Sequence, residues 1–447
     1  MKKKRTKLKY DNIFIFFSIL YLGILFITYS IRFVYYYTQE NKKPKTIEET
    51  TFSEYLISND TNLLKSDDKY YYVGKDINNY VLYSGIMFRI VSISDGQIKL
   101  VTDENMTSLV MTYDQDDYAK TYTNIWLNEI DGEDYSGIFS SILTDKSKYL
   151  VNTKTCVDVV DNYENVKECK KYNDSYLVGL LSIDEYINAS ANNSYLNNDS
   201  YFWLSNINKD GNYWYVFDKG GLSDNSKTEV NYHSYAVRPT ITLNKDVTLI
   251  SGDGTKDNPY IFEKNENKLL INRNVGEYVN YGGFLWRIVS LKDGNAKLVL
   301  ADALKVDNEE VLKLYDLEGS SYYNCNYYTY LNNTFYNRLT DKSLIIKSNW
   351  YDGDYNALSN FDYRHIYTDS VSAYVGLLNI GEMFIYDVND AFLMTPSNKD
   401  MLYSVKDNKL FIEKMSEKLK VRPAIYIDGT VNITGEGTKS SPYEIEG

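Results

Sequence analysis

Aromatic side chains form the densest group of residues in this sequence that could do chemistry. Two strand-like runs, Phe202-Trp203 and Tyr213-Trp214-Tyr215, are followed shortly by a third aromatic segment, Tyr232–Tyr235. Aromatic rings exposed in a groove suit carbohydrates or peptides, because each ring offers a large contact area with few rotatable bonds. The alternative is that alternate members, such as Trp203 and Trp214, belong to the core, which leaves the tyrosines exposed. The predicted ligand-binding residues are Tyr213, Tyr215, Tyr232, His233 and Tyr235.

Histidine-based catalysis has few options, because the chain contains only two histidines, His233 and His365. We interpret both as residues of surface loops. A Ser/His/Asp triad would have to assemble from distant segments, and no nucleophile-elbow motif is present. We therefore predict no catalytic residues and a protein that is not an enzyme.

Acidic loops could in principle hold calcium. Of the acidic clusters, Asn206–Gly211 matches the opening of an EF-hand loop, but Phe217 stands where that motif requires a glutamate. A hairpin turn at Lys209-Asp210-Gly211 explains this segment better. We predict no metal site and no cofactor.

Three cysteines do not make a disulfide framework. Cys156 and Cys169 flank a polar stretch and could close a small loop in an oxidising compartment, whereas Cys325 has no obvious partner. No CxxC pair or Cys/His spacing indicates zinc.

An apolar segment near the start predicts a membrane anchor. Residues 13–31 contain no charge and would span about 28 Å as a helix, close to the thickness of a bilayer core. The basic run Lys2–Lys9 favours a cytoplasmic N-terminus. A cleaved signal peptide or a buried core helix is the alternative, but no small-residue cleavage site follows. The sequence thus predicts a single-pass protein of the cell membrane: a cytoplasmic tail at 1–12, a transmembrane helix in the lipid bilayer at 13–36, a polar stalk at 37–69 and an extracellular body.

Charge argues against nucleic acid as a partner. The whole chain is −13 and residues 1–45 are +8, which leaves −21 for residues 46–447. An acidic body repels phosphate backbones, so we predict that it does not bind nucleic acid.

The elements that must position these residues occur twice. Residues 80–101 align without a gap to residues 278–299, with 13 of 22 positions identical. Further matches follow in the same order: Leu143–Ser147 with Leu339–Ser343, Val178–Leu181 with Val375–Leu378, Val237–Pro239 with Val421–Pro423, and Gly252–Tyr260 with Gly435–Tyr443. Collinear matches over this length indicate a duplicated domain. We set repeat 1 at residues 70–263 and repeat 2 at residues 268–447.

Each repeat predicts hairpins, short helices and long loops, an α+β unit. The runs 88–93 and 97–102 are joined by Ser94-Asp95-Gly96, a strong hairpin signal. Ser182–Glu185 has the spacing of a capping box, so a short helix is expected there, and another around residues 124–130. Arg238 and Arg422 recur at matching positions among apolar residues, which favours a structural role for them.

These paired elements resemble an uncharacterised family of bacterial surface domains with a C-type-lectin-like fold, which formylglycine-generating-enzyme-like domains share. The motifs carrying the resemblance are the hairpin Trp286–Gly294, the segment Trp126-Leu127-Asn128, the step Gly179–Glu185 and the strand Val237–Leu243. The resemblance implies a fold and a surface location without an established activity. The active-site cysteine pair of the formylglycine-generating branch has no counterpart in the matching region.

Taken together, the sequence predicts an α+β protein in which a transmembrane helix precedes two tandem C-type-lectin-like domains. The expected function is non-enzymatic binding or adhesion to an extracellular ligand, carbohydrate or peptide. Two alternatives stay open: an envelope enzyme with one active and one degenerate copy, and a structural component of an envelope complex.

Overall fold

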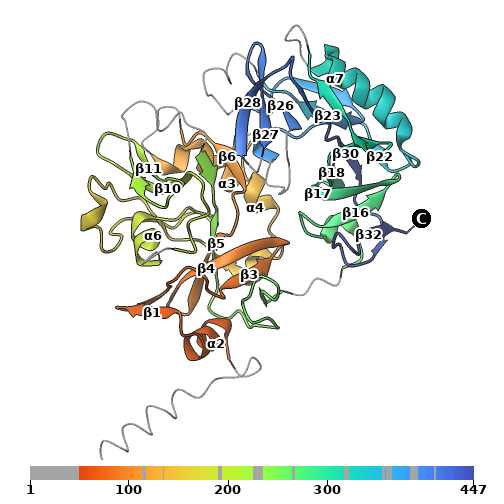
Figure 1. Ribbon diagram of the computed structural model, residues 1–447. Coiled ribbons are helices and arrows are strands. Elements are labelled where there is room, and N and C mark those ends of the chain that lie inside the picture. Colours follow the sequence, from red (N-terminus) through yellow and green to blue (C-terminus); the bar gives the residue numbers. More distant parts are fainter. Residues whose placement is uncertain are drawn as a thin grey trace, which may run out of the picture.

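The computed structural model describes residues 50–446 apart from residues 113–116, 134, 190–193, 225–234, 264–266, 317–321, 355–357, 359–364, 383–390 and 407–408. Two lobes lie next to each other, and each contains one repeat (Figure 1). Strands dominate both lobes and the helices are short, so the fold is mainly β-sheet and agrees only in part with the predicted α+β class.

The predicted transmembrane helix at 13–36 lies outside the described residues. In the part of the chain that the structure does describe, no helix is both long enough and apolar enough to cross a bilayer. The fold class is corrected accordingly, and the description as a single-pass membrane protein finds no support.

Repeat 1 is built on an eight-stranded sheet. Its strands are β1 (Leu63–Ser66), β2 (Lys69–Tyr72), β3 (Tyr80–Tyr83), β4 (Ile86–Ser94), β5 (Gln97–Thr102), β7 (Leu150–Val151), β14 (Thr240–Leu243) and β15 (Tyr260–Ile261). They follow the order β1-β2-β4-β5-β14-β7, and β3 pairs with both β4 and β15. The turn between β4 and β5 places Asp95 and Gly96 at positive φ, which confirms the predicted tight hairpin.

The same topology returns in repeat 2. Its main sheet contains β16 (Tyr278–Tyr281), β17 (Phe284–Lys292), β18 (Asn295–Leu300), β22 (Ile345–Ile346), β25 (Val375–Gly376), β30 (Ala424–Asp428), β31 (Ile433–Thr434) and β32 (Tyr443–Ile445). The order β32-β16-β17-β18-β30-β22 reproduces β15-β3-β4-β5-β14-β7 strand for strand. Even the register shift recurs, between Ile90 and Ser92 in β4 and between Ile288 and Ser290 in β17. The two repeats therefore share one strand order and one register shift.

A second, five-stranded sheet is also duplicated. In repeat 1 it runs β12 (Leu222–Ser223), β11 (Tyr213–Val216), β10 (Phe202–Ile207), β13 (Tyr235–Val237), β6 (Thr107–Leu109). In repeat 2 it runs β28 (Lys409–Lys414), β27 (Met401–Lys406), β26 (Ala391–Asn398), β29 (Lys418–Lys420), β21 (Leu312–Leu314). In both sheets the central pair, β10 with β13 and β26 with β29, is parallel and its outer neighbours are antiparallel.

A hairpin with two short strands comes directly after the edge strand of each main sheet, β7 in repeat 1 and β22 in repeat 2. In repeat 1 it joins β8 (Thr155–Cys156) to β9 (Tyr172–Asn173), and in repeat 2 it joins β23 (Ser348–Tyr351) to β24 (Ser370–Ala373). Repeat 2 has one further hairpin, β19 (Lys305–Val306) with β20 (Glu309–Glu310).

The helices are α2 (Phe52–Asn59), α3 (Tyr122–Leu127), α4 (Ile138–Ser141), α5 (Lys146–Tyr149), α6 (Ile183–Ala189) and α7 (Asn326–Thr329). The predicted capping box is present at α6: the Glu185 amide donates to the Ser182 hydroxyl, and the Ser182 amide donates to the Glu185 carboxylate. In repeat 2 the same step makes only a 3₁₀ turn, η10 (Ile380–Glu382). Helix α3 agrees with the helix expected near residues 124–130 but begins and ends earlier.

Part of the predicted stalk belongs to repeat 1. Helix α2 begins with a capping box at Thr51, and its Phe52 and Leu56 are fully buried. The hairpin β1–β2 extends the main sheet beside β4. Residues 51–69 therefore pack into repeat 1, which extends to the N-terminal side of the predicted boundary at residue 70.

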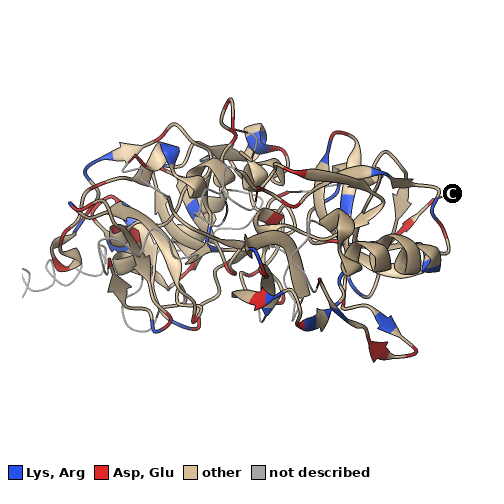
Figure 2. Ribbon diagram, turned by 90° about the horizontal axis from the view of Figure 1, so that it is seen from above, with Lys and Arg blue, Asp and Glu red and all other residues tan. Residues whose placement is uncertain are grey.

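The two repeats share a packed interface. The indole of Trp126 on α3 donates to the carbonyl of Gly381 at 2.8 Å, and the hydroxyl of Thr107 on β6 donates to the carbonyl of Ile380 at 2.8 Å. Buried apolar side chains from both repeats form one continuous cluster. Figure 2 shows acidic and basic residues interspersed over both lobes in that view, without a basic face.

Candidate functional site: a polar groove in repeat 1

The aromatic residues predicted to bind a ligand are mostly buried. Tyr213 is fully buried and Tyr215 is 6% exposed, whereas Tyr235 is half-buried. Tyr232 and His233 lie outside the described residues. The prediction of exposed tyrosines on β11 is wrong because this sheet is covered on both faces, so alternate residues do not alternate between core and solvent.

What the sequence identified is instead a packed aromatic cluster. The ring centroid of Tyr235 lies 4.7 Å from those of Trp203 and Tyr215, and 5.4 Å from that of Tyr201. Tyr201 is 43% exposed. Burial raises the pKa of Tyr235, as does its neighbour Tyr215. The cluster stabilises the second sheet and presents little ring surface to a ligand.

The two recurring arginines have structural partners. Arg238 is buried and donates to the carbonyls of Thr102 and Asp103, and Arg422 donates in the same way to Leu300 and Ala301. Each guanidinium therefore ties the late strand of its repeat to the end of a neighbouring strand through backbone oxygens, which agrees with the expected structural role.

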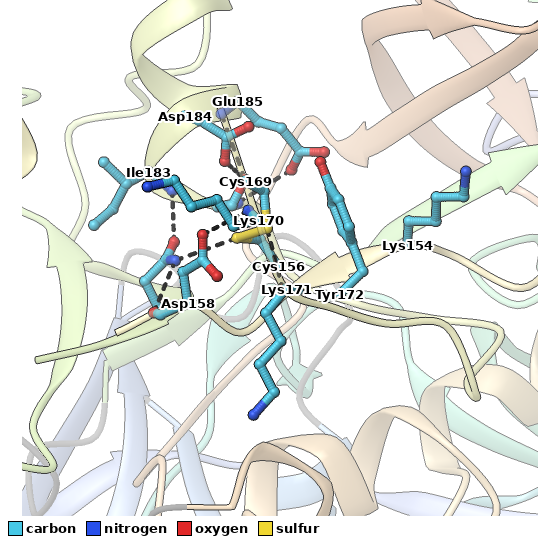
Figure 3. Close-up of a disulfide and its surroundings, with 12 residues drawn as sticks. Lys154, Cys156, Asp158, Cys169, Lys170, Lys171, Tyr172, Ile183, Asp184 and Glu185 are labelled. Atoms are coloured by element: carbon cyan, nitrogen blue, oxygen red, sulfur yellow. Dashed lines mark hydrogen bonds between the residues drawn. A yellow bond between two sulfur atoms is a disulfide. The ribbon is translucent and has the colours of Figure 1, made fainter. Parts of the chain in front are cut away.

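Cys156 and Cys169 form a disulfide, as the sequence suggested (Figure 3). The bond closes the loop between β8 and β9 beside Tyr172, which pairs with Cys156 across the hairpin. A carboxylate oxygen of Asp158 lies within 4.8 Å of both sulfurs. Because the sulfurs are bonded to each other, they offer no thiolate to a metal ion, and Asp158 accepts a hydrogen bond from the Lys170 amide.

A buried lysine–glutamate pair occurs at the same place in both repeats. The Lys99 ammonium lies 2.5 Å from a Glu185 carboxylate oxygen, and the Lys297 ammonium lies 2.6 Å from Glu382. In each case a lysine on the third strand of the core hairpins meets the glutamate that caps the strand-to-helix step. Since both copies keep the pair, it belongs to the scaffold of the domain.

In repeat 1 this pair lies at the floor of a groove with a volume of about 330 Å³. The floor crosses three adjacent strands, β4, β5 and β14, and carries mainly small polar side chains. The full lining is Asp68, Lys69, Tyr71, Ser92, Ser94, Asp95, Gln97, Lys99, Asn152, Lys154, Tyr172, Glu185 and Thr242. With strands about 4.8 Å apart, the floor extends for about 10 Å across the sheet.

In repeat 2 aromatic side chains cover the corresponding lysine. Trp350, which is 1% exposed, and Tyr426 place their ring centroids 4.8 and 5.1 Å from the Lys297 ammonium. Tyr426 pairs with Lys297 across the sheet as Thr242 pairs with Lys99. Trp350 packs on Gly376 as Thr155 packs on Gly179. Two changes from threonine to an aromatic residue thus separate the open copy from the covered one.

The walls of the groove are formed by two segments of repeat 1 that differ from the equivalent parts of repeat 2. One is β2, which carries Lys69 and Tyr71; the other is the disulfide-closed hairpin, which carries Lys154 and Tyr172. The walls meet where the Lys69 ammonium donates to the Tyr172 hydroxyl at 3.5 Å. Tyr172 reaches toward the Glu185 carboxylate (Figure 3). The Lys99 ammonium also donates to the Lys154 carbonyl at 3.1 Å, which links floor to wall.

The pKa shifts in the groove suit binding better than proton transfer. Burial and the carboxylates of Glu185 and Asp184 raise the pKa of Tyr71. Burial likewise raises the pKa of Tyr172, against the opposing effect of Lys69. For Lys69, burial opposes the charged form, but Tyr172 and the two acids outweigh it and the pKa is raised. A tyrosine or lysine acting as a base needs a lowered pKa, so these groups stay protonated and serve as hydrogen-bond donors.

One neighbouring acid is shifted in the same direction. Burial, reinforced by Glu185, raises the pKa of Asp184, although the Ser182 hydroxyl donates to it at 2.6 Å. Asp184 is 2% exposed. Its carboxylate contributes negative charge behind the groove and does not reach the ligand space.

The sequence contained a usable signal for this site. Lys99 recurs as Lys297 within the aligned block, and Glu185 recurs as Glu382 after the matched Val-Gly-Leu-Leu segments. Recurrent opposite charges among apolar strand residues indicate a buried pair. The walls could not be found in this way, because Lys69 and Tyr172 are separated by more than a hundred residues and lie outside the matched segments.

Comparisons with protein-family models, with curated proteins and with solved structures find no match for this chain. The C-type-lectin-like resemblance therefore stays a prediction, and no family is assigned.

Proposed function

We propose that this protein is a non-enzymatic binding protein whose first repeat holds a polar ligand, carbohydrate or peptide, in the groove above Lys99 and Glu185. The observation that carries the proposal is the difference between the copies. Both keep the buried ion pair, but a groove of about 330 Å³ lies over it in repeat 1, whereas the rings of Trp350 and Tyr426 lie over the lysine in repeat 2. That volume lies within the range of small-ligand sites.

The chemistry of the lining supports a polar ligand. Serine, threonine, asparagine and glutamine side chains of the floor both donate and accept hydrogen bonds, and the tyrosine hydroxyls and lysines add donors. Repeat 2 then serves as the closed partner that braces repeat 1 through Trp126 and Thr107.

We also propose that the protein works in an oxidising compartment outside the cytoplasm. The support is the disulfide between Cys156 and Cys169, since such bonds persist mainly in secreted and envelope proteins. The acidic composition of residues 46–447 is compatible with a solvated exterior.

The test is to fill the groove with an aromatic side chain at position 242, the position equivalent to Tyr426 in repeat 2. Full-length protein with Thr242→Tyr should lose binding on an array of envelope glycans and peptides, while its thermal unfolding stays close to that of the wild type. Thr430→Tyr, at an exposed position of repeat 2, is the matched control and should bind normally. Equal binding by wild type and Thr242→Tyr would place the ligand elsewhere, and no binding by the wild type would argue against the proposal itself.

A further inference from the structure

Some residues of the groove have an equivalent in repeat 2, and these are the shared residues. The others, the added residues, belong to segments that differ between the repeats. The ion pair is shared, and so is Asp95, whose counterpart Asp293 occupies the same turn at the same positive φ. These residues are explained by the scaffold. What repeat 1 adds are the walls, and the wall residues in the groove are Asp68, Lys69, Tyr71, Lys154 and Tyr172.

The added groups are mainly donors. Lys69 and Lys154 contribute two ammonium groups, and among the described residues neither has a carboxylate within ion-pair distance. Tyr71 and Tyr172 contribute protonated hydroxyls. The single added acid, Asp68, is an exposed residue of the turn between β1 and β2. A donor-rich wall is complementary to a ligand rich in acceptors, and two ammonium groups favour one that carries negative charge.

The floor and one ring indicate the rest of the ligand. Ser92, Ser94, Gln97 and Thr242 present polar side chains on three adjacent strands, along about 10 Å of sheet, which suits a chain of hydroxyl groups. Tyr172 is 39% exposed, so part of its ring is accessible in the groove. An aromatic ring beside hydroxyl-bearing side chains is complementary to a sugar ring, which has an apolar face and a polar rim.

We infer that the groove of repeat 1 takes an acidic saccharide, its hydroxyls on the serine and threonine floor and its acidic group at Lys69, Lys154 and the Tyr172 hydroxyl. The inference rests on the proposed function and narrows its ligand class. Sugar carboxylates, sulfates and phosphates share this chemistry, and the probes distinguish them. Because Asp68, Asp95 and Glu185 also line the groove and oppose an anionic ligand, the attraction for its acidic group must come from Lys69 and Lys154.

The probes are a panel of oligosaccharides of uronic acids, each paired with its neutral methyl ester, together with sulfated and phosphorylated disaccharides. Calorimetric titration of the full-length protein should give an affinity for at least one acidic member that is roughly tenfold above that for its neutral partner. The preference should shrink as salt is raised, because an exposed ammonium is screened.

The variants test the assigned cations. Lys69→Gln should remove most of the preference for the acidic member and leave the affinity for the ester nearly unchanged, and Lys154→Gln should do so to a smaller extent because its side chain is more exposed. Lys65→Gln is the matched control, since Lys65 is on the same hairpin in β1 but does not line the groove. Thermal unfolding of each variant checks that the hairpin still folds.

The outcomes separate this inference from the proposed function. Equal binding of acid and ester, or a preference that survives Lys69→Gln, overturns the acidic-saccharide assignment while binding in the groove stands. Binding of tetraglutamate as tight as that of the best saccharide overturns the saccharide part. If nothing on the glycan and peptide arrays binds, the proposed function falls and the inference falls with it.

Discussion

Asp352 shows how repeat 2 buries a charge that it does not fully satisfy. One oxygen of its carboxylate accepts a hydrogen bond from the Tyr322 amide at 3.2 Å, and the other is buried without a hydrogen-bond partner among the described residues. Asp352 is 8% exposed. Burial raises its pKa from 3.8 to about 6, against the opposing effect of the Tyr322 amide.

This raised pKa predicts that the free energy of unfolding decreases as the pH rises from about 4 to about 6. Between pH 4 and pH 6 the folded protein holds a proton on Asp352 that the unfolded chain has lost, so the stabilisation is complete below about pH 4 and is lost as pH rises through 6. The expected loss is about 3 kcal/mol at most, from a shift of roughly two units. Denaturant unfolding at a series of pH values measures it.

Asp352→Asn removes the titrating group and should flatten this part of the profile. Asp302→Asn, whose carboxylate is 63% exposed, is the control and should leave the slope unchanged. A wild-type slope that persists in Asp352→Asn would assign the pH dependence to another group.

One of the two positions that distinguish the open copy of the ion pair from the covered one lies directly across the sheet from the lysine. Thr242 and Tyr426 occupy equivalent places beside the lysine, and the larger side chain covers it. Because the pair itself is buried and costly to break in either copy, changes around it are the easier route to altering the groove.

At the scale of elements, the hairpin β8–β9 combines a short strand ladder with a disulfide. Its ladder contains only the pairs Thr155 with Asn173 and Cys156 with Tyr172. The cysteines are 13 residues apart in sequence, so the bond restricts a loop of that size in the unfolded chain. On the chain-entropy model this stabilises the protein by about 3 kcal/mol.

Removing the bond should therefore affect both stability and the groove. Cys156→Ser with Cys169→Ser should lower the free energy of unfolding by about 2–3 kcal/mol and weaken ligand binding, because Tyr172 and Lys154 lie on this hairpin. Thermal unfolding with and without reductant measures the first effect: reductant should lower the wild-type midpoint and leave the double variant unchanged. Cys325→Ala, a buried thiol in repeat 2, is the control, and its sensitivity to reductant should equal that of the wild type.

The elements that the sequence predicted well are those with local causes. The turn at Asp95-Gly96 needs positive φ, and the capping box at Ser182–Glu185 needs two residues at fixed spacing, so each can be recognised from a short segment. The duplication was visible for the same reason, since the two copies can be aligned directly.

The elements that the sequence could not supply depend on distant contacts. Period-two alternation on β11 indicated one exposed face, but tertiary packing covers both, so Tyr213 and Tyr215 were misassigned. The groove walls come from β2 and from the disulfide hairpin, and their contact through Lys69 and Tyr172 appears only after folding.

At the scale of the whole molecule, the two repeats contribute different elements to the interface between them. Repeat 1 contributes α3 and β6, and repeat 2 contributes the turn η10. Since one cluster of buried apolar residues extends through both lobes, we expect the repeats to unfold together in a single calorimetric transition.

Weakening the interface should make the two repeats unfold in separate transitions. Trp126→Phe with Thr107→Val removes both hydrogen bonds to the backbone of η10 and leaves the Ile380 and Gly381 carbonyls without these donors, at a cost of roughly 1–3 kcal/mol for each carbonyl. Scanning calorimetry should then resolve two transitions. Thr240→Val, a buried threonine within repeat 1 away from the interface, is the control and should keep a single transition. Two transitions already in the wild type would contradict the expected coupling.

In each repeat the first strand of the duplicated set pairs in parallel with the last, β3 with β15 and β16 with β32. A unit whose entry and exit are adjacent can be copied in line without disturbing the hydrogen-bonded order inside it. With this geometry the whole domain can be duplicated in tandem. Both copies then retain the same core sheets, while the segments at the groove differ between repeat 1 and repeat 2.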